Sequence, residues 1–187
     1  MDFQDNVAPA EWQARPAHNI AMEPPPFTAE ILAILQRDLD GFRREIQLFP
    51  DDRTPWQTAP GVANSAANLA LHIAGNIQHF IGQNLGGIAY ARNRDDEFGR
   101  RAGSREMLIA ELGRAIAVIE QVLPTVGAAQ LDAPFPGATT PAPVSTRRFL
   151  LHLATHAAFH LGQAGYLRRI VTGNPESTNT VTSARLA

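Results

Sequence analysis

Hydrophobic residues recur every three or four positions in four long segments of the chain, which is the spacing of one face of an α-helix. These segments predict helices over about residues 28–49, 64–89, 104–123 and 145–172, with Thr28, Ser104 and Ser145 at the beginnings of three of them. No segment alternates apolar and polar residues over the length of a strand. The pattern predicts an all-α protein, a four-helix bundle.

The segments outside the helices divide the chain into three parts. Prolines at positions 9, 16 and 24–26 predict an extended arm over residues 1–27. The bundle is expected over residues 28–173, and the polar segment 174–187 is expected to be a flexible tail. Two connections, residues 91–103 and 125–144, exceed the usual length of a turn between neighbouring helices.

Four glycines interrupt the second predicted helix, at Gly75, Gly82, Gly86 and Gly87. Glycine disfavours the helix interior by roughly 1 kcal/mol relative to alanine. Their clustering predicts a close approach of another helix, a bend, or a helix end near Gly86.

Composition limits the function classes. The chain has 187 residues, 44% of them hydrophobic, which suits one domain. The net charge of −2 provides no basic surface for nucleic acid, so no nucleic-acid partner is expected. No apolar run approaches the ~18 residues that cross a membrane, and the first residues do not resemble a signal peptide. We therefore expect a cytoplasmic protein with no membrane partner.

The chain contains no cysteine. This excludes disulfides, thiolate metal sites and a cysteine nucleophile, so any thiol chemistry needs an external thiol. Protein metal ligands are then limited to histidine and carboxylates. That restriction favours an open site that keeps water over a closed structural site.

Five of the six histidines lie on two predicted helices: His72 and His79 on the second, His152, His156 and His160 on the fourth. A four-residue spacing drifts only about 40° per step, so the last three follow one stripe of their helix. A single histidine there is more often a hydrogen-bonded core residue. Several buried imidazoles without partners would each cost a few kcal/mol (order of magnitude), and one ion satisfies three at once, so the set favours a metal site.

Spacing restricts which histidines can share an ion. His152 and His160 are about 12 Å apart along a helix, so one site needs His156 with one of these two and a histidine from the other helix. If the second and fourth helices are antiparallel, one layer contains His72, His156 and His160, and His79 faces His152 in another. Spacing alone leaves open which layer binds metal.

Three stretches, NLALHIAGNIQHFI, FLLHLATHAAFHLGQAGYLRR and LGGIAYARNRDDEF, resemble the DinB-like, YfiT-type superfamily, whose members are regarded as metalloenzymes. The resemblance covers about residues 28–172. It implies a bundle in up-down-down-up order, a zinc or nickel ion on His72, His156 and His160 with open water positions, and homodimers. Some relatives transfer the thiols bacillithiol, mycothiol or glutathione. His79 and His152 fall outside the family triad.

The resulting hypothesis is a metal-dependent transferase that aims a small external thiol at a small-molecule electrophile. The loop after the second helix supplies candidates for proton transfer or ligand orientation, with Arg94 and Glu97 preferred over Tyr90, Asp95 and Asp96. One alternative is a metal-dependent hydrolase with Glu97 or Asp96 as base. Another is a non-catalytic metal-binding stress protein. Gln163 is expected only to hydrogen-bond a helix end.

Overall fold

A computed structural model describes residues 26–138 and 140–185 and gives an all-α fold. In these residues the only β-type contact is an isolated bridge between Pro134 and Ser145. The arm expected over residues 1–27 lies outside the described part, apart from its last two residues. The four long helices are α1 (Phe27–Gln47), α2 (Ala66–Ile77), α4 (Arg105–Val122) and α6 (Thr146–Thr172).

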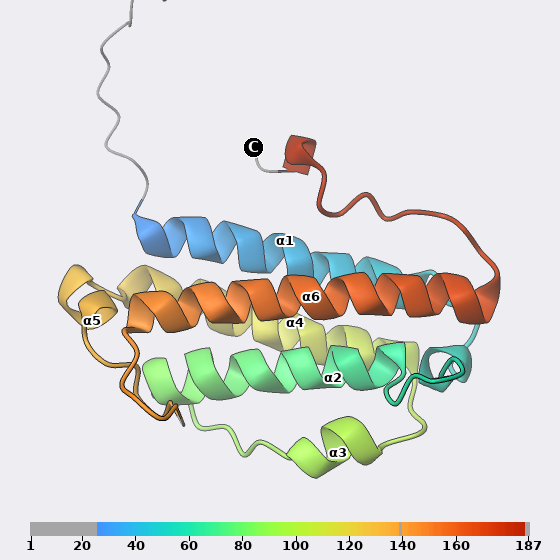
Figure 1. The fold of residues 1–187 in the computed structure, drawn as a ribbon, viewed down its shortest axis with the longest axis horizontal. Coiled ribbons are helices and arrows are strands. Elements are labelled where there is room, and N and C mark those ends of the chain that lie inside the picture. The colour runs from blue at the N-terminus through green and yellow to red at the C-terminus, as the bar shows by residue number, and fades with distance from the viewer. Residues whose placement is uncertain (1–25, 139, 186–187) are drawn as a thin grey trace, which may run out of the picture.

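These helices pack side by side as a four-helix bundle (Figure 1). α1 and α6 run in one direction, and α2 and α4 run in the other (Figure 1). α1 and α2 each pack against both α4 and α6. The order is therefore up-down-down-up, and α2 and α6 are antiparallel neighbours.

Serine side chains cap three of the long helices. Ser65, Ser104 and Ser145 each accept a hydrogen bond from a backbone N–H in the first turn, which confirms the last two as predicted caps. Thr28 is not a cap, because the extended backbone of Pro26 already begins α1 and leaves Thr28 buried inside the helix. α6 ends at Gly173 in the left-handed conformation, as the sequence predicts.

The second predicted helix is two consecutive elements. α2 continues as a π-helix, η2 (Gln78–Leu85), and ends at Gly86, short of the predicted end at residue 89. A side chain at Gly86 would collide with Val122 of α4. Both a close helix contact and an end near Gly86 are thus confirmed.

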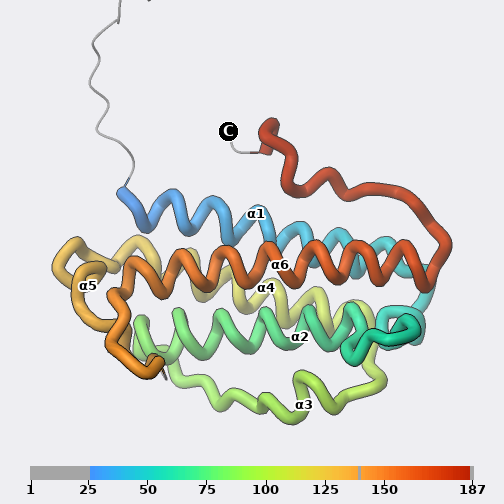
Figure 2. The backbone as a smooth tube through the Cα atoms, in the orientation of Figure 1, coloured from blue at the N-terminus to red at the C-terminus, as the bar shows by residue number. Residues whose placement is uncertain are grey.

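The connection between α2 and α4 runs back along the bundle, because these two helices point the same way (Figure 2). It contains the short helix α3 (Arg94–Gly99), so the prediction of an irregular loop over residues 91–103 is wrong there. Asn93 caps α3 by accepting a hydrogen bond from the Asp96 N–H. Asn68 of α2 donates to the carbonyl oxygen of Glu97 at 2.9 Å, which holds α3 against α2.

The connection between α4 and α6 also contains short helices: η3 (Leu123–Thr125) and α5 (Ala128–Asp132). Two further short 3-10 helices are η1 (Thr54–Trp56) and η4 (Ser183–Arg185). Trp56 is buried and donates its indole N–H to the carbonyl of Gly103 at 2.8 Å. None of the helices described is long and apolar enough to cross a membrane.

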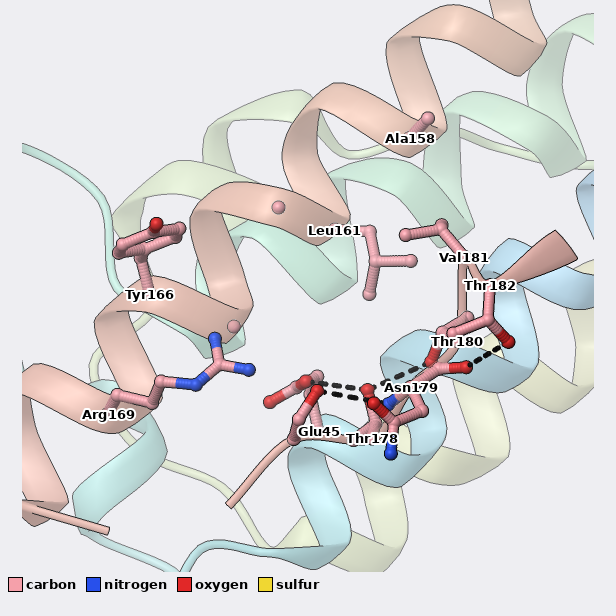
Figure 3. A pocket seen from close by; sticks show the side chains of 13 residues that line it. Glu45, Ala158, Leu161, Tyr166, Arg169, Thr178, Asn179, Thr180, Val181 and Thr182 are labelled. Atoms are coloured by element: carbon pink, nitrogen blue, oxygen red, sulfur yellow. Dashed lines mark hydrogen bonds between the residues drawn. The ribbon is translucent and has the colours of Figure 1, made fainter. Parts of the chain in front are cut away.

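The segment after α6, expected to be a flexible tail, turns back toward α1 (Figure 1) and contacts it through Thr178 and Thr180. Arg168 is fully buried and donates to Glu45 at 2.5 Å and to the carbonyl of Asn174 at 3.2 Å. The Thr178 hydroxyl donates to the other oxygen of Glu45 at 2.9 Å (Figure 3). The tail therefore supplies polar partners to a buried ion pair, and a pocket of about 280 Å³ lies beside these contacts.

Candidate metal centre

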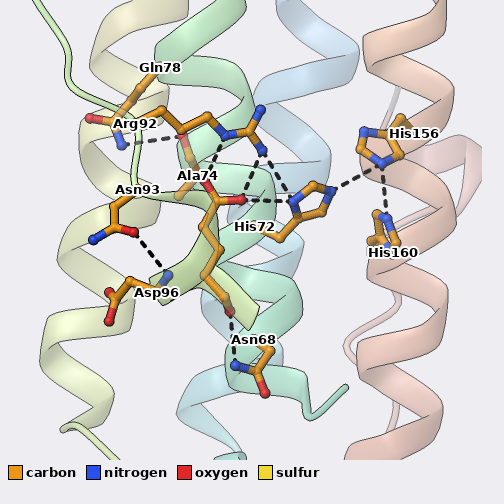
Figure 4. Close-up of polar contacts among 10 residues, drawn as sticks. Asn68, His72, Ala74, Gln78, Arg92, Asn93, Asp96, His156 and His160 are labelled. Atoms are coloured by element: carbon orange, nitrogen blue, oxygen red, sulfur yellow. Dashed lines mark hydrogen bonds and ion pairs between the residues drawn. The ribbon is translucent and has the colours of Figure 1, made fainter. Parts of the chain in front are cut away.

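Three histidines from two helices converge between α2 and α6. His72 comes from α2, and His156 and His160 come from successive turns of α6 (Figure 4). Nε2 of His156 lies 3.4 Å from Nε2 of His72 and 3.0 Å from Nε2 of His160. One nitrogen from each ring lies within 4.8 Å of the other two. The structure therefore assembles the first of the two histidine layers that the spacing allowed.

The outer ring nitrogens of two histidines have acceptors that fix their tautomers. Nδ1 of His72 lies 3.0 Å from Oε2 of Glu97, and Nδ1 of His160 lies 2.7 Å from Oε1 of Gln163. Because these oxygens accept, each Nδ1 carries the hydrogen and each Nε2 presents a lone pair. The third ring differs, since Nδ1 of His156 is buried without a partner among the described residues.

The converging lone pairs fit a cation. Two unprotonated Nε2 atoms that face one another repel unless a proton or a metal ion lies between them. At a metal–nitrogen distance of about 2.0–2.1 Å, two ligands at angles between octahedral and tetrahedral are about 2.8–3.4 Å apart. The two measured separations, 3.0 and 3.4 Å, match this range. The donor set therefore suits a divalent ion.

Burial keeps His156 and His160 neutral. It lowers the pKa of His156 to about 4, with further lowering from the neighbouring His160 and His72. Burial also lowers the pKa of His160, although its hydrogen bond to Gln163 partly opposes this. Neutral imidazoles are the form that binds metal, so little proton competition is expected at neutral pH.

Glu97 is the anionic partner of the site. Its side chain is buried, and Arg92 donates to both of its oxygens at 2.7 and 2.8 Å (Figure 4). Burial alone would raise the pKa of Glu97, but the hydrogen bonds from His72 and Arg92 outweigh it and hold the pKa below its usual value. The carboxylate is therefore ionised and is held on the edge of His72 opposite the converging Nε2 atoms.

A glycine of α2 makes room for this carboxylate. A Cβ atom at Gly75 would lie well inside van der Waals contact with Oε1 of Glu97. The neighbouring hydroxyl of Tyr90 is also close to that position. Gly75 is thus required for Glu97 to reach His72.

The other candidates from the same loop lie elsewhere. Arg94 stacks over Phe98, with Cζ 5.0 Å from the ring centroid, and forms no described contact with the triad. Asp96 pairs with Arg100, and Asp95 contacts none of the three histidines in the described part of the chain. The guanidinium that reaches the site is that of Arg92, which sequence reasoning missed.

Gln163 was also underestimated. It accepts from His160, instead of only bonding a helix end. Its position three residues after His160 was the signal, because side chains at that spacing meet on a helix.

The second predicted layer is not formed. His79 bonds Gln83 at 2.9 Å, and His152 stacks on His156 with ring centroids 5.7 Å apart and planes 8° apart. No described hydrogen bond or ring contact joins His79 to His152. The π-helix begins at Gln78, so the α-helical phase used to predict that pairing does not continue through His79.

Comparisons with known proteins support the fold and the family resemblance described above. The model of the DinB superfamily matches residues 3–164. A crystal structure of a conserved protein from Enterococcus faecalis superposes with a TM-score of 0.66 at 19% identity, covering 79% of this chain and 98% of that one, which supports the fold. No curated protein matches the sequence. With most of its length matched by the family model and a bundle of the expected order, the chain belongs to the DinB superfamily.

Proposed function

We propose that this protein is a metal-dependent enzyme that holds a divalent ion, zinc or nickel, on His72, His156 and His160. The observation that carries the proposal is the convergence of three Nε2 atoms, with the ring of His72 oriented by Glu97 and the ring of His160 by Gln163. Three protein ligands leave coordination positions for a small molecule. A purely structural metal site would be expected to close its coordination shell with protein groups.

The reaction we propose is thiol transfer to a small electrophile. The ion, when bound, supplies Lewis acidity that favours the deprotonated form of a thiol. Because the chain has no cysteine, the thiol is a separate low-molecular-weight molecule. Its S–H proton passes to solvent, and its sulfur forms a bond to the electrophilic carbon. In a substitution the leaving group departs from that carbon with the bonding electron pair. In an addition the electron pair of the acceptor's double bond shifts away from that carbon and takes up a proton from solvent.

The chain's own residues position the site. Glu97 acts through His72: its charge strengthens the imidazole as a ligand, and Arg92 fixes the carboxylate. Gln163 orients His160 in the same way without adding charge. Glu97 is therefore proposed as a positioning residue.

The contacts of two carboxylates argue against the hydrolase alternative. A general base must reach the proton that it removes. Glu97 is occupied by His72 and Arg92, and Asp96 by Arg100. The non-catalytic alternative predicts a different experimental result: the protein would bind metal but would turn over no substrate.

Elemental analysis of the purified protein beside His156→Ala and His79→Ala is the first test. We expect one ion per chain in wild type and in His79→Ala, and loss of the ion in His156→Ala. Stoichiometric metal in His156→Ala would overturn the site assignment. Turnover of an aryl halide is then measured with bacillithiol, mycothiol or glutathione. Hydrolysis of ester substrates without thiol would favour the hydrolase, and metal binding with no turnover would favour the non-catalytic protein.

A further inference from the structure

The metal centre continues into a row of aromatic contacts toward the N-terminus of α6. His156 stacks on His152, and the ring centroid of His152 lies 5.8 Å from that of Phe149. Phe149 in turn lies 5.1 Å from Phe80 of η2. Arg92 connects Phe80 to the triad. Its Cζ lies 5.9 Å from the Phe80 centroid, and its Nη2 lies 3.3 Å from Nδ1 of His72. The two facing helix edges thus form a closed ring of contacts that begins and ends at the histidine triad.

His152 is the exposed member of this ring of contacts, and its ring nitrogens form no hydrogen bond among the described residues. A neutral imidazole has one nitrogen that accepts a hydrogen bond. A ligand that donates a hydrogen bond would therefore find a partner at His152.

A pocket of about 440 Å³ opens on the outer side of this ring. Phe149 and His152 belong both to the ring and to the pocket lining. Val144 and Ala142 add an apolar wall. The pocket is large enough for a small organic molecule, and its inner end is at the residue that stacks on His156.

The outer end of the pocket is cationic. Arg148 lines it, is exposed, and forms no salt bridge among the described residues. It lies in the first turn of α6, which has no acidic residue to balance the positive end of the helix dipole. By contrast, the adjacent Arg147 pairs with Asp132 at 3.2 Å. The free cation and the helix end both favour an anionic group at this mouth.

We propose that this pocket binds the electrophilic substrate of the metal centre, and that the substrate is an amphipathic carboxylate. Its carboxylate pairs with Arg148, and its apolar or aromatic body lies against Phe149 and Val144. A hydrogen-bond donor at its other end reaches the ring of His152. Four residues of helix separate Arg148 from His152, about 6 Å along the axis, so the molecule spans little more than one helical turn and the reach of the two side chains. This inference rests on the proposed function for the reaction, but the pocket itself can be tested by binding alone.

The test uses calorimetric titration of metal-free and metal-loaded full-length protein with three probes. Para-hydroxyphenylbutyrate carries both the carboxylate and the donor, phenylbutyrate lacks the donor, and para-hydroxyphenylbutanamide lacks the charge. In Arg148→Gln we expect affinity for the two carboxylates to fall about tenfold and affinity for the amide to stay the same. Arg147→Gln is the matched control and should bind all three probes as wild type does.

His152→Phe, which keeps an aromatic ring beside His156 but removes the hydrogen-bond acceptor, tests the inner end. We expect it to remove the preference of wild type for para-hydroxyphenylbutyrate over phenylbutyrate, about tenfold at most, while Arg148-dependent binding remains. The inference is overturned if wild type binds none of the probes, or if Arg148→Gln and Arg147→Gln lose affinity equally. Metal content of each variant separates the two proposals: probe binding lost with the ion retained contradicts only the pocket, whereas wild type without an ion contradicts the proposed function.

Discussion

Oε2 of Glu97 lies 3.0 Å from Nδ1 of His72, although the two residues are 25 positions apart and belong to different helices. This contact depends on the long connection between α2 and α4, which runs back along α2 (Figure 2) and packs α3 against it. The parallel direction of α2 and α4 makes such a connection necessary. The connection that the bundle order requires therefore also places the carboxylate of Glu97 beside the buried His72.

Removing this charge should weaken metal binding. Glu97→Gln keeps the shape of the side chain and a carbonyl acceptor for His72, but loses the anion that Arg92 holds. We expect metal affinity to fall about 10–100-fold, as measured by competition with a chromogenic chelator. Glu111→Gln, at a partly exposed residue of α4 paired with Arg114, is the control. Equal affinities of the Glu97→Gln variant and wild type would refute a role for Glu97 in orienting His72.

Gly75→Ala should disturb the site although the substitution removes no polar side chain. The added methyl group would collide with Oε1 of Glu97, so the carboxylate must move away from His72. We expect metal affinity to fall about tenfold or more, in the same direction as for Glu97→Gln. Gly113→Ala in α4 meets nothing within 4 Å and should leave affinity unchanged while stabilising the helix by roughly 0.5–1 kcal/mol. Chelator competition and thermal unfolding distinguish the two effects.

The sequence pattern was sufficient to predict the helices, whose apolar residues recur at regular spacing. It was insufficient to predict features that depend on a single side-chain contact. Helix spacing and serine caps located the long helices, and antiparallel packing of α2 and α6 was enough to offer the layer of His72, His156 and His160. The contact of Arg92 with the site could not be predicted in this way, because it depends on where Asn93 begins α3. Two arginines two positions apart cannot be ranked by periodicity when the backbone between them leaves an extended segment and enters a helix.

The metal-free protein should lose stability as pH falls from about 6.5 toward 4. The pKa of His156 is about 4 in the folded protein and 6.5 in its unperturbed state. The unfolded chain therefore takes up a proton first as pH falls through 6.5, which favours unfolding. The destabilisation increases until the folded pKa is reached.

Other groups titrate in the same window, so the difference between two proteins is the measurement. Denaturant unfolding of metal-free wild type and His156→Gln is compared at pH values across this range. We expect the variant to show a shallower loss of stability, since it has one fewer group that protonates on unfolding. Identical slopes for the two proteins would contradict the lowered pKa of His156.

Asp38 of α1 should destabilise the protein when it is ionised. Its side chain is fully buried, and Oδ2 has no partner in the described residues, while Oδ1 accepts from Arg37 at 2.8 Å. Burial raises its pKa, and this effect exceeds the opposing effect of Arg37. A carboxyl group with a raised pKa binds its proton more tightly in the folded state, so its ionised form costs stability at higher pH. Asp38→Asn removes the charge but keeps an oxygen for Arg37, and we expect stabilisation of about 1 kcal/mol at pH 7.

The pH dependence distinguishes this explanation from a general effect of the substitution. The advantage of Asp38→Asn should shrink as pH falls, because wild-type Asp38 then becomes protonated and also neutral. Asp40→Asn, at a half-exposed residue paired with Arg43, should change the free energy of unfolding by less than about 0.5 kcal/mol. Urea unfolding of the three proteins at neutral and acidic pH gives these differences. A destabilised Asp38→Asn at pH 7 would mean that the buried carboxylate has a partner that stabilises its charge more strongly than Arg37 alone can.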